Sequence, residues 1–388
     1  MNTYKHMILE SKILTFINSH TEREFDSFYV YDKEKIRSKC RMFRQISYPN
    51  KSIHFASMAN VHPEFLAVVK EEKLNVFVNS LIHLDVVHQA GFSRHDIIFT
   101  SSALTEKTMK RIESFGVQVN LDSPGQLEQW KRLFPNKRVG IRCNIGDRVK
   151  PFSNHAGSFI GKESRLGFTE SELNALSDKS FIKGLHLYVG TDIVDIDYFK
   201  ACYKELIAMA SDFPDLEYLN FGGGFGVAEN GDHHFDISAY DEAVTKLMNE
   251  FSVQSGKSIR LMLEPGRIIG GTSGYFVCCV TDIKIRPERR LVGVNASTVQ
   301  FPRPLMYPDT ARHPVAVVRN GEQMRSASGL PTTVYGCSTY SRDIFSKDVE
   351  LPELQVGDIL VYGNAGSYSA SSYMQFLGFP KPEEYFIE

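Results

Sequence analysis

The 388-residue sequence lacks the features of a membrane-inserted or exported protein. No uninterrupted apolar run approaches the roughly 20 residues that a membrane-spanning helix needs. The N-terminal segment, Met1 to His20, mixes charged and polar side chains into its apolar positions and has no small-residue cleavage site of a secretory signal. These absences predict a cytoplasmic protein without a membrane partner.

The sequence also lacks a metal-binding cysteine pattern and an excess of charge. The six cysteines form no CxxC pair and have no histidine-flanked spacing, so neither a metal site nor a disulfide framework is expected. The net charge is -2 with 23% charged residues, which offers no electrostatic footprint for a phosphate backbone. We therefore expect no nucleic-acid partner.

What the sequence does contain is a repeated alternation of short apolar runs and helical stretches between residues 50 and 270. Eight runs are candidate strands: Ser52–Ala56, Asn75–Ser80, Ile97–Ser101, Val117–Leu121, Arg138–Cys143, Ile182–Val189, Leu216–Phe221 and Ile259–Leu263. Helices are predicted over stretches that include Ala103–Ser114, Ser123–Leu133, Asp197–Ser211 and Ile237–Phe251, the last one after the candidate N-cap Asp236. This α/β pattern predicts a closed (β/α)8 TIM-like barrel, whose functional groups gather at the C-terminal strand ends.

After Gly274 the pattern changes to short strands separated by Pro, Gly and Asn turns. The run Phe28–Tyr31 precedes the first barrel helix and is expected to pair with these later strands. The predicted organisation is a barrel over 32-273 and a β domain built from 1-31 and 274-388. The expected strands of the β domain are Tyr275–Ile285, Leu291–Asn295, Pro314–Val318, Thr332–Tyr335 and Asp358–Tyr362.

Two motifs fall at the ends of the last two predicted barrel strands. Gly222–Gly226 reads GGGFG, which lets bare backbone N–H groups approach an anion, although a tight turn that needs positive φ explains such a run as well. Glu264–Arg267 reads EPGR and adds a carboxylate and a guanidinium at the same rim. A phosphate and a basic ring nitrogen can both be met there. Far downstream, Gly366–Tyr368 supplies a phenol.

In these motifs, and over nearly its whole length, the chain resembles the pyridoxal-phosphate decarboxylases that act on ornithine, arginine, lysine and diaminopimelate, which have an alanine-racemase-like fold. The resemblance implies pyridoxal 5'-phosphate as the cofactor, with Glu264 keeping the pyridine nitrogen protonated. The cofactor-binding residues that it implies at these motifs are Gly223, Gly224, Glu264, Gly266, Arg267 and Tyr368.

The stretch Gly184–Thr191 resembles the family segment in which a histidine stacks on the cofactor ring and a Ser or Thr touches the phosphate. Tyr188 occupies the stacking position here, and Thr191 the phosphate position. An aromatic face still offers dispersion contact, so we expect binding to persist with altered electronics. Arg142 resembles the arginine near the ring hydroxyl, with a structural salt bridge as the alternative interpretation.

The family's Schiff-base lysine lies in a Tyr-Ala-x-Lys-Ala-Asn stretch, which here reads Phe-Ala-Ser-Met-Ala-Asn over Phe55–Asn60. Met58 therefore occupies the lysine position, and a thioether cannot form an imine. Lys51 lies near the other end of the strand, out of reach at about 3.3 Å per residue. Only non-covalent contacts are expected to hold the cofactor.

A second family landmark is a Cys-Asp/Glu-Ser-x-Asp motif donated across a dimer interface. It aligns with Thr339–Asp343, so we expect a head-to-tail homodimer. Thr339 replaces the proton-donating cysteine, and a hydroxyl is a far weaker acid than a thiol, whose pKa is about 8.5. Tyr340 replaces the acidic residue that meets the substrate's distal amine, and Cys337 could serve only after loop rearrangement. The implied catalytic positions are Met58, Thr339, Tyr340, Asp343 and Cys337.

His83 stands where the family usually has glutamate, and a hydrogen-bonded structural role is favoured over a catalytic one. An introduced Lys→Met change would explain Met58 alone, whereas the further changes at Thr339, Tyr340 and His83 favour a natural homologue with altered chemistry. Three functions remain open. They are a decarboxylase-like enzyme for an amino acid or carrier-linked amino acid, an inactive homologue that binds a partner, and racemase-type chemistry, which does not share the two rim motifs.

Overall fold

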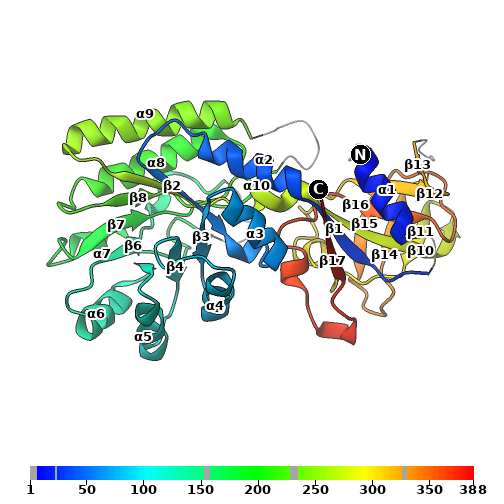
Figure 1. Cartoon of the computed structure of the whole chain (residues 1–388), viewed down its shortest axis with the longest axis horizontal. Helices are drawn as coiled ribbons and strands as arrows, with labels where there is room; N and C mark the ends of the chain where they lie inside the picture. The colour runs from blue at the N-terminus through cyan, green and yellow to red at the C-terminus, as the bar shows by residue number, and fades with distance from the viewer. Residues whose placement is uncertain (1–6, 22–23, 153–157, 228–234, 326–329) are drawn as a thin grey trace. The chain divides into compact units, whose positions relative to one another are not determined.

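The computed structural model describes residues 7–21, 24–152, 158–227, 235–325 and 330–388, which are drawn in Figure 1. Chain contacts divide the protein into two compact units. The described residues of Arg37–Gly226 and His234–Ile268 form one unit, and those of Met1–Ile36, Val227–His233 and Ile269–Glu388 form the other.

In its described residues, the first unit is a closed barrel of parallel strands. Each strand pairs with the next in sequence, and β9 closes the barrel on β2. All eight strands expected from the sequence are present, so the predicted α/β barrel is confirmed. The strands are β2 (Lys51–Ala56), β3 (Asn75–Val78), β4 (Ile97–Ser101), β5 (Gln118–Leu121), β6 (Val139–Arg142), β7 (Ile182–His186), β8 (Tyr218–Asn220) and β9 (Arg260–Leu263).

Several strands end earlier than the apolar runs that predicted them. β7 stops at His186 rather than Val189, and β3 stops at Val78 rather than Ser80. Val189 is buried although it lies in a loop. A buried loop and a buried strand share the same apolar character, so the run alone does not mark the strand end.

Helices connect the barrel strands and begin where side chains cap them. Asp236 accepts hydrogen bonds from the backbone N–H groups of Ser238 and Ala239, which confirms it as the N-cap of α9. Ser123 caps α6 in the same way. The described barrel helices are α2 (Lys33–Arg44), α3 (Pro63–Glu71), α4 (Leu81–Gln89), α5 (Glu106–Phe115), α6 (Pro124–Leu133), α7 (Glu170–Asn174), α8 (Ile196–Ala210), α9 (Ile237–Ser255) and α10 (Arg267–Gly270).

Side chains fill the inside of the barrel. Tyr218 on β8 donates to Asn120 Oδ1 on β5 at 2.6 Å, and these two strands are not neighbours, so the bond crosses the lumen. Asn120 Nδ2 in turn donates to Thr100 Oγ1 at 2.9 Å. A Cβ at Gly140 or Gly184 would collide with the Tyr218 ring. The lumen is therefore a packed core, which leaves the strand ends for function.

The second unit is a β domain, as the sequence predicted. Its sheet has the strand order β13-β12-β16-β10-β11-β14-β15, and β1 pairs with β10 and β17. The antiparallel pairing of β1 with β10 confirms the expected partner of Phe28–Tyr31. The strands are β1 (Phe28–Asp32), β10 (Gly274–Arg286), β11 (Arg289–Val294), β12 (Val315–Arg319), β13 (Glu322–Met324), β14 (Thr332–Tyr335), β15 (Ile344–Val349), β16 (Ile359–Tyr362) and β17 (Glu383–Ile387).

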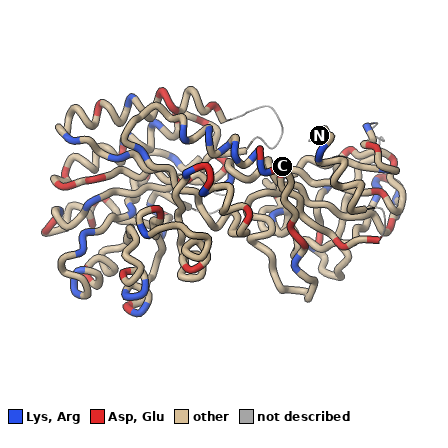
Figure 2. Tube along the Cα trace, viewed as in Figure 1, with Lys and Arg blue, Asp and Glu red and all other residues tan. Residues whose placement is uncertain are grey.

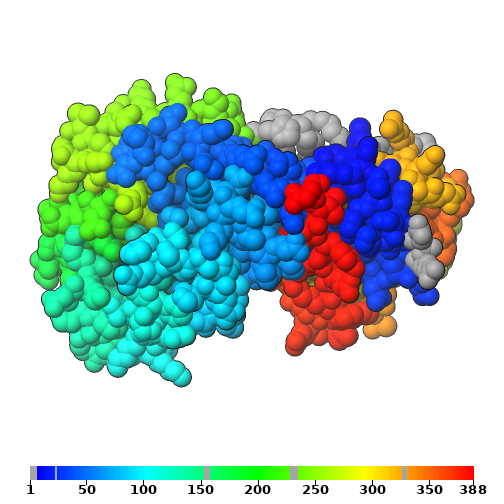
Figure 3. Space-filling view, viewed as in Figure 1, coloured from blue at the N-terminus to red at the C-terminus, as the bar shows by residue number. Residues whose placement is uncertain are grey.

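The two ends of the chain meet in this unit. β17 pairs in parallel with β1, and the Tyr31 and Phe386 rings stack at 4.6 Å. Figure 3 shows the blue N-terminal residues beside the red C-terminal residues. Neither β17 nor the N-terminal helix α1 (Ser11–His20) was expected from the sequence. Each is stabilised by contacts that are distant in sequence, which local patterns do not report.

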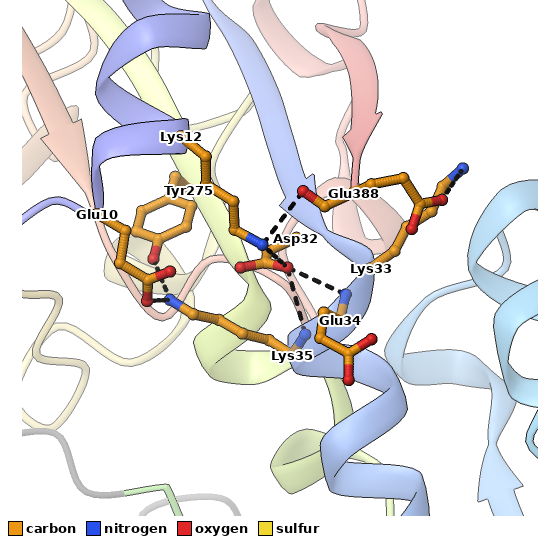
Figure 4. Close-up of polar contacts among 8 residues, drawn as sticks. All are labelled: Glu10, Lys12, Asp32, Lys33, Glu34, Lys35, Tyr275 and Glu388. Carbon is orange, nitrogen blue, oxygen red and sulfur yellow. Dashed lines mark hydrogen bonds and ion pairs between the residues drawn. The ribbon is translucent and has the colours of Figure 1, made fainter.

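A polar cluster joins α1 to the end of β1 (Figure 4). Asp32 is buried, accepts from Lys12 Nζ at 2.8 Å and accepts from the backbone N–H groups of Glu34 and Lys35. Lys35 Nζ lies 2.7 Å from Glu10 Oε1 and donates to Tyr275 Oη at 2.6 Å. The buried carboxylate thus has its hydrogen bonds satisfied while it caps the start of α2.

Positively and negatively charged residues are interspersed along both units (Figure 2), and the net charge of the sequence is -2. Among the described residues, no helix combines the length and the apolar character needed to span a membrane.

Candidate active site

The two rim motifs lie side by side at the ends of β8 and β9. Glu264 N donates to Gly222 O at 2.8 Å. A Cβ at Gly223 would lie well inside van der Waals contact with the carbonyl oxygen of Glu264. Gly224 has φ of +101°, and a Cβ there would lie 2.6 Å from Gly190 O. Close backbone approach therefore requires these glycines, in addition to the positive φ of the turn.

Glu264 is buried and ionised. Asn220 Nδ2 donates to its Oε1 at 2.6 Å, and His186 Nε2 lies 3.3 Å from its Oε2. Burial by itself would raise the pKa of Glu264, but His186 and the hydrogen bond from Asn220 outweigh it, so the pKa lies below its usual value. The site therefore holds a fixed negative charge, which suits a protonated ring nitrogen.

His54 on β2 also neighbours Glu264 but adds no charge near neutral pH. Burial lowers the pKa of His54 from 6.5 to about 4, and the nearby Glu264 carboxylate only partly opposes this shift. The ring is therefore neutral at pH 7, and His186 and Asn220 supply the stabilisation of Glu264.

The lowered pKa of His54 predicts a pH dependence of folding. Below pH 6.5 His54 is protonated in the unfolded chain, whereas in the folded chain it stays neutral down to about pH 4. The free energy of unfolding therefore decreases as the pH falls from 6.5 to about 4. We expect His54→Gln to remove about 2 kcal/mol of the loss between pH 7 and pH 5, at roughly 1.4 kcal/mol per pKa unit. Urea unfolding of both proteins at the two pH values measures this difference. A stability gap that stays constant with pH would contradict the prediction.

Arg142 and Tyr188 come together near the glycine turn. The Arg142 Cζ atom lies 5.9 Å from the centroid of the Tyr188 ring. A Cβ at Gly223 would lie 3.8 Å from the same ring. The Tyr188 ring also meets Phe159 edge-on, with the centroids 4.9 Å apart. Tyr188 is thus held beside the turn that is expected to bind phosphate.

The Arg142 guanidinium retains unused donors. Its Nη1 is 3.9 Å from Asp122 Oδ1, and that carboxylate already accepts from Ser102 Oγ at 2.6 Å and from Gly167 N at 3.1 Å. Arg142 Nε and Nη2 are buried and have no hydrogen-bond partner among the described residues. A salt bridge alone, the alternative interpretation of Arg142, would leave both groups unsatisfied, which favours a polar ligand at this position.

Arg267 is committed to another side chain. It is buried and forms an ion pair through Nε with Asp192, the residue after Thr191. Asp192 has a φ of +55°, so the ion pair holds a strained residue of the loop that follows β7. Gly266 is buried beside Arg267. Direct phosphate binding by Arg267, Gly266 and Thr191 stays a prediction.

Met58 is half-buried in the 3-10 turn η1 (Ser57–Ala59) that follows β2. Ala56 N donates to Pro265 O at 3.0 Å, which brings the Met58 turn next to the EPGR motif. Lys51 Nζ donates to Tyr48 O at the opposite end of β2. No amine on β2 therefore reaches the position of Met58.

His83 lies in the first turn of α4, which contacts η1. Its Nδ1 is buried and has no hydrogen-bond partner among the described residues. Burial lowers the pKa of His83, which favours a neutral ring. The choice between a structural and a catalytic role for His83 stays a prediction.

The predicted catalytic loop lies in the β domain. Asp343 is buried and accepts from Thr298 N at 2.6 Å and from Thr298 Oγ1 at 2.7 Å. It also accepts from the backbone N of Ser338 at 3.1 Å and from the Ser338 hydroxyl. These bonds give Asp343 a structural role in shaping its own loop.

The other predicted residues of the β domain are more open. The Tyr340 ring meets Phe376 edge-on at 5.7 Å, and Cys337 is an exposed thiol whose pKa is raised by partial burial and by Asp343. Tyr368 has a φ of +53°, an uncommon conformation for a non-glycine residue. Catalytic roles for Thr339, Tyr340, Asp343 and Cys337, and phosphate binding by Tyr368, stay predictions.

The contacts of Glu264 include two residues that the sequence analysis did not select, Asn220 and His186. Both are the last residue of a barrel strand, β8 and β7, where functional groups are expected. Their position at the strand ends was the only feature of the sequence that could have identified them as functional. The sequence does not show which of several polar strand-end residues contacts Glu264, because this contact depends on side-chain geometry.

The barrel residues fit a phosphorylated pyridine in three respects. The glycine turn packs its bare backbone against the end of β9, the lowered pKa of Glu264 favours its ionised form, and Arg142 has buried N–H groups without a partner among the described residues. An amine for covalent attachment is missing at Met58. The donor set therefore suits the cofactor without a tether.

Comparison with known proteins agrees with this fit. Residues 33–271 match the family model described as pyridoxal-dependent decarboxylase, pyridoxal binding domain. The diaminopimelate decarboxylase of Methanothermobacter thermautotrophicus is 28% identical over 378 residues, covering 92% of this chain and 86% of that protein. The Escherichia coli diaminopimelate decarboxylase is 26% identical over 362 residues, covering 88% and 84%.

A solved structure supports the fold. The diaminopimelate decarboxylase of Helicobacter pylori, complexed with L-lysine, superposes with a TM-score of 0.86 at 23% identity, covering 96% of this chain and 94% of that one. The family model spans well over half of the 388 residues and contains both rim motifs. The chain therefore belongs to the pyridoxal-dependent decarboxylase family, and its barrel is the pyridoxal-binding domain.

Proposed function

We propose that the protein holds pyridoxal 5'-phosphate without a covalent bond and acts as a decarboxylase-type lyase on an amino acid or a carrier-linked amino acid. When bound, this cofactor supplies an electron sink for the bond that breaks at the amino-acid α-carbon. The observation that carries the proposal is the buried Glu264 carboxylate, whose pKa is lowered by His186 and Asn220 and whose backbone is hydrogen-bonded to the glycine turn. A buried charge is costly, and this one lies at the C-terminal ends of the barrel strands, where functional groups are expected.

The roles of the barrel residues follow from their positions. Gly223 and Gly224 offer backbone N–H groups to the phosphate. Glu264 holds a proton at the ring nitrogen, and Tyr188 packs against the ring. Arg142 supplies its unpaired N–H groups to an oxygen of the ligand.

Tyr340, in place of an acidic residue, favours a substrate that lacks a distal amine. A phenol provides no negative charge near neutral pH to pair with an ammonium group. We also propose a homodimer, since the segment Thr339–Asp343 keeps the position of the family motif. Sedimentation of a strictly monomeric protein would contradict this part.

The second candidate is a homologue without activity that binds a partner protein. The replacements at Met58 and Thr339 favour it, because each removes a group with chemical function. The retention of the ionised Glu264 in a buried position argues against it. The two candidates differ in whether the isolated protein binds the cofactor.

Binding of three related ligands tests the proposal. Pyridoxal, pyridoxamine and pyridoxine 5'-phosphates differ at one ring substituent, which is an aldehyde only in the first. Because Met58 provides no amine to react with this aldehyde, we expect the three dissociation constants to agree within about tenfold. Calorimetry measures the three constants, and inorganic phosphate serves as the control for phosphate binding alone. Amino acids incubated with the loaded protein are then assayed for CO₂ release.

Two outcomes would contradict the proposal. No binding of any of the three ligands at micromolar concentration would favour the partner-binding candidate. A preference of more than a hundredfold for the aldehyde form, together with cofactor that stays on the chain after reduction and denaturation, would reveal a covalent bond to another lysine. Protein treated with borohydride and analysed by mass spectrometry identifies such a bond.

A further inference from the structure

Asn220 joins the glycine turn to the ring-nitrogen carboxylate. It is fully buried at the end of β8. Its Oδ1 accepts from Gly222 N at 2.9 Å, and its Nδ2 donates to Glu264 Oε1 at 2.6 Å. One amide side chain therefore bonds to both motifs.

His186 holds the other oxygen of the same carboxylate. It is 2% exposed, and its Nε2 lies 3.3 Å from Glu264 Oε2. An ionised carboxylate only accepts hydrogen bonds, so Nε2 carries the hydrogen. Asn220 and His186 thus approach the two oxygens of Glu264 from neighbouring strands, and we call this pair the Glu264 clamp.

The remaining ionisable groups that face Glu264 do not replace the clamp. His54 on β2 is neutral because burial lowers its pKa to about 4. Arg142 on β6 interacts with Glu264 through space, with no hydrogen bond between them in the described part of the chain. Burial raises the pKa of Tyr218 on β8, which keeps its phenol neutral, and its hydroxyl donates to Asn120.

We propose that Asn220 and His186 are positioning residues that keep Glu264 ionised and aligned with the Gly222–Gly224 turn, so that the site selects a phosphate ester carrying a protonated ring nitrogen over one that lacks it. This rests on the proposed function only for the identity of the ligand. The clamp itself is a property of the protein without ligand.

Asn220→Asp separates the two contacts of Asn220. An aspartate keeps an oxygen for Gly222 N but has no N–H group for Glu264, and it places a second carboxylate beside the first. Glu264 then ionises less readily. The glycine turn keeps its hydrogen bond, so binding of the phosphate itself is expected to persist.

The experiment compares two ligands on the native protein and its variants. Pyridoxine 5'-phosphate carries the ring nitrogen, and phenyl phosphate lacks it. We expect Asn220→Asp to lower the preference for the pyridine ligand about tenfold or more, as the loss of a hydrogen bond to a charged group implies. His186→Leu should have a similar effect, whereas His186→Gln keeps a donor and should restore most of the preference.

The pH profile gives a readout that a merely structural role would not move. Binding of the pyridine ligand requires ionised Glu264. The pH below which the affinity for this ligand falls is therefore set by the pKa of Glu264. In Asn220→Asp and His186→Leu that pKa rises, and this limiting pH should move up by about one unit. Thermal unfolding confirms that each variant is folded.

An unchanged ligand preference in folded Asn220→Asp, or equal values for His186→Gln and His186→Leu, would overturn the inference. NMR titration of the Glu264 carboxyl in the ligand-free protein tests the role of the clamp independently of ligand binding. If the native protein binds neither ligand, the proposed function fails, and the inference then depends on this titration alone. A Glu264 carboxyl that titrates at the same pH in native and variant proteins would overturn it.

Discussion

Met58→Lys is expected to convert non-covalent cofactor binding into covalent attachment. The introduced amine follows β2 in a turn that neighbours the EPGR motif through the Ala56 N to Pro265 O bond. Partial burial would lower the pKa of this amine and make it more nucleophilic. We expect one cofactor per chain after borohydride reduction, measured by intact mass, and CO₂ release from an amino acid that lacks a distal amine.

Met58→Leu is the matched control, since it conserves volume and adds no amine. It should bind the cofactor like the native protein and gain no mass on reduction. A Met58→Lys protein that binds the cofactor but gains no mass would mean that the turn points the side chain away from the ligand. That outcome would also weaken the assignment of Met58 to the lysine position.

Gly223→Ala is expected to damage both stability and binding. The added Cβ would collide with the carbonyl oxygen of Glu264, a backbone atom that cannot move without shifting β9. Overpacking of this kind costs about 1–3 kcal/mol. Because the same shift separates the glycine turn from Glu264, we expect pyridoxine 5'-phosphate binding to fall at least tenfold.

Gly125→Ala is the control for the change of residue type. Gly125 lies in α6, and a Cβ there would meet nothing within 4 Å. This substitution should stabilise the protein by about 0.5–1 kcal/mol, because alanine is the better helix former. Urea unfolding measures both variants. Equal stabilities for Gly223→Ala and the native protein would show that the strand ends can separate without cost.

The barrel could be predicted from the sequence because its strands are buried on both faces. Runs such as Ile97–Ser101 are apolar or β-branched except for the terminal serine, and their regular spacing with helical segments indicates the fold directly. The β domain was predicted less completely. β15 and β17 carry charged residues at partly exposed positions, so their local pattern resembles a loop.

Within the candidate site, the sequence predicted where the motifs lie, but it did not predict which hydrogen bonds and ion pairs their side chains form. The glycine turn and Glu264 were expected at one rim and lie there. Arg267, expected at the phosphate, pairs with Asp192, and Asp343 is occupied by its own loop. Such pairings depend on residues far away in sequence, and several equivalent partners exist before the chain folds.

By itself, the sequence determined the family, the order of the strands and the missing amine at Met58, because each follows from residue type and spacing along the chain. Only the tertiary structure decided that Asn220 and His186 hold Glu264 and that Arg142 keeps unpaired donors. These contacts join strands that are neighbours or near neighbours only in the closed barrel. The physical reason is that a hydrogen bond depends on distance and direction in space, which a linear pattern of residues does not contain.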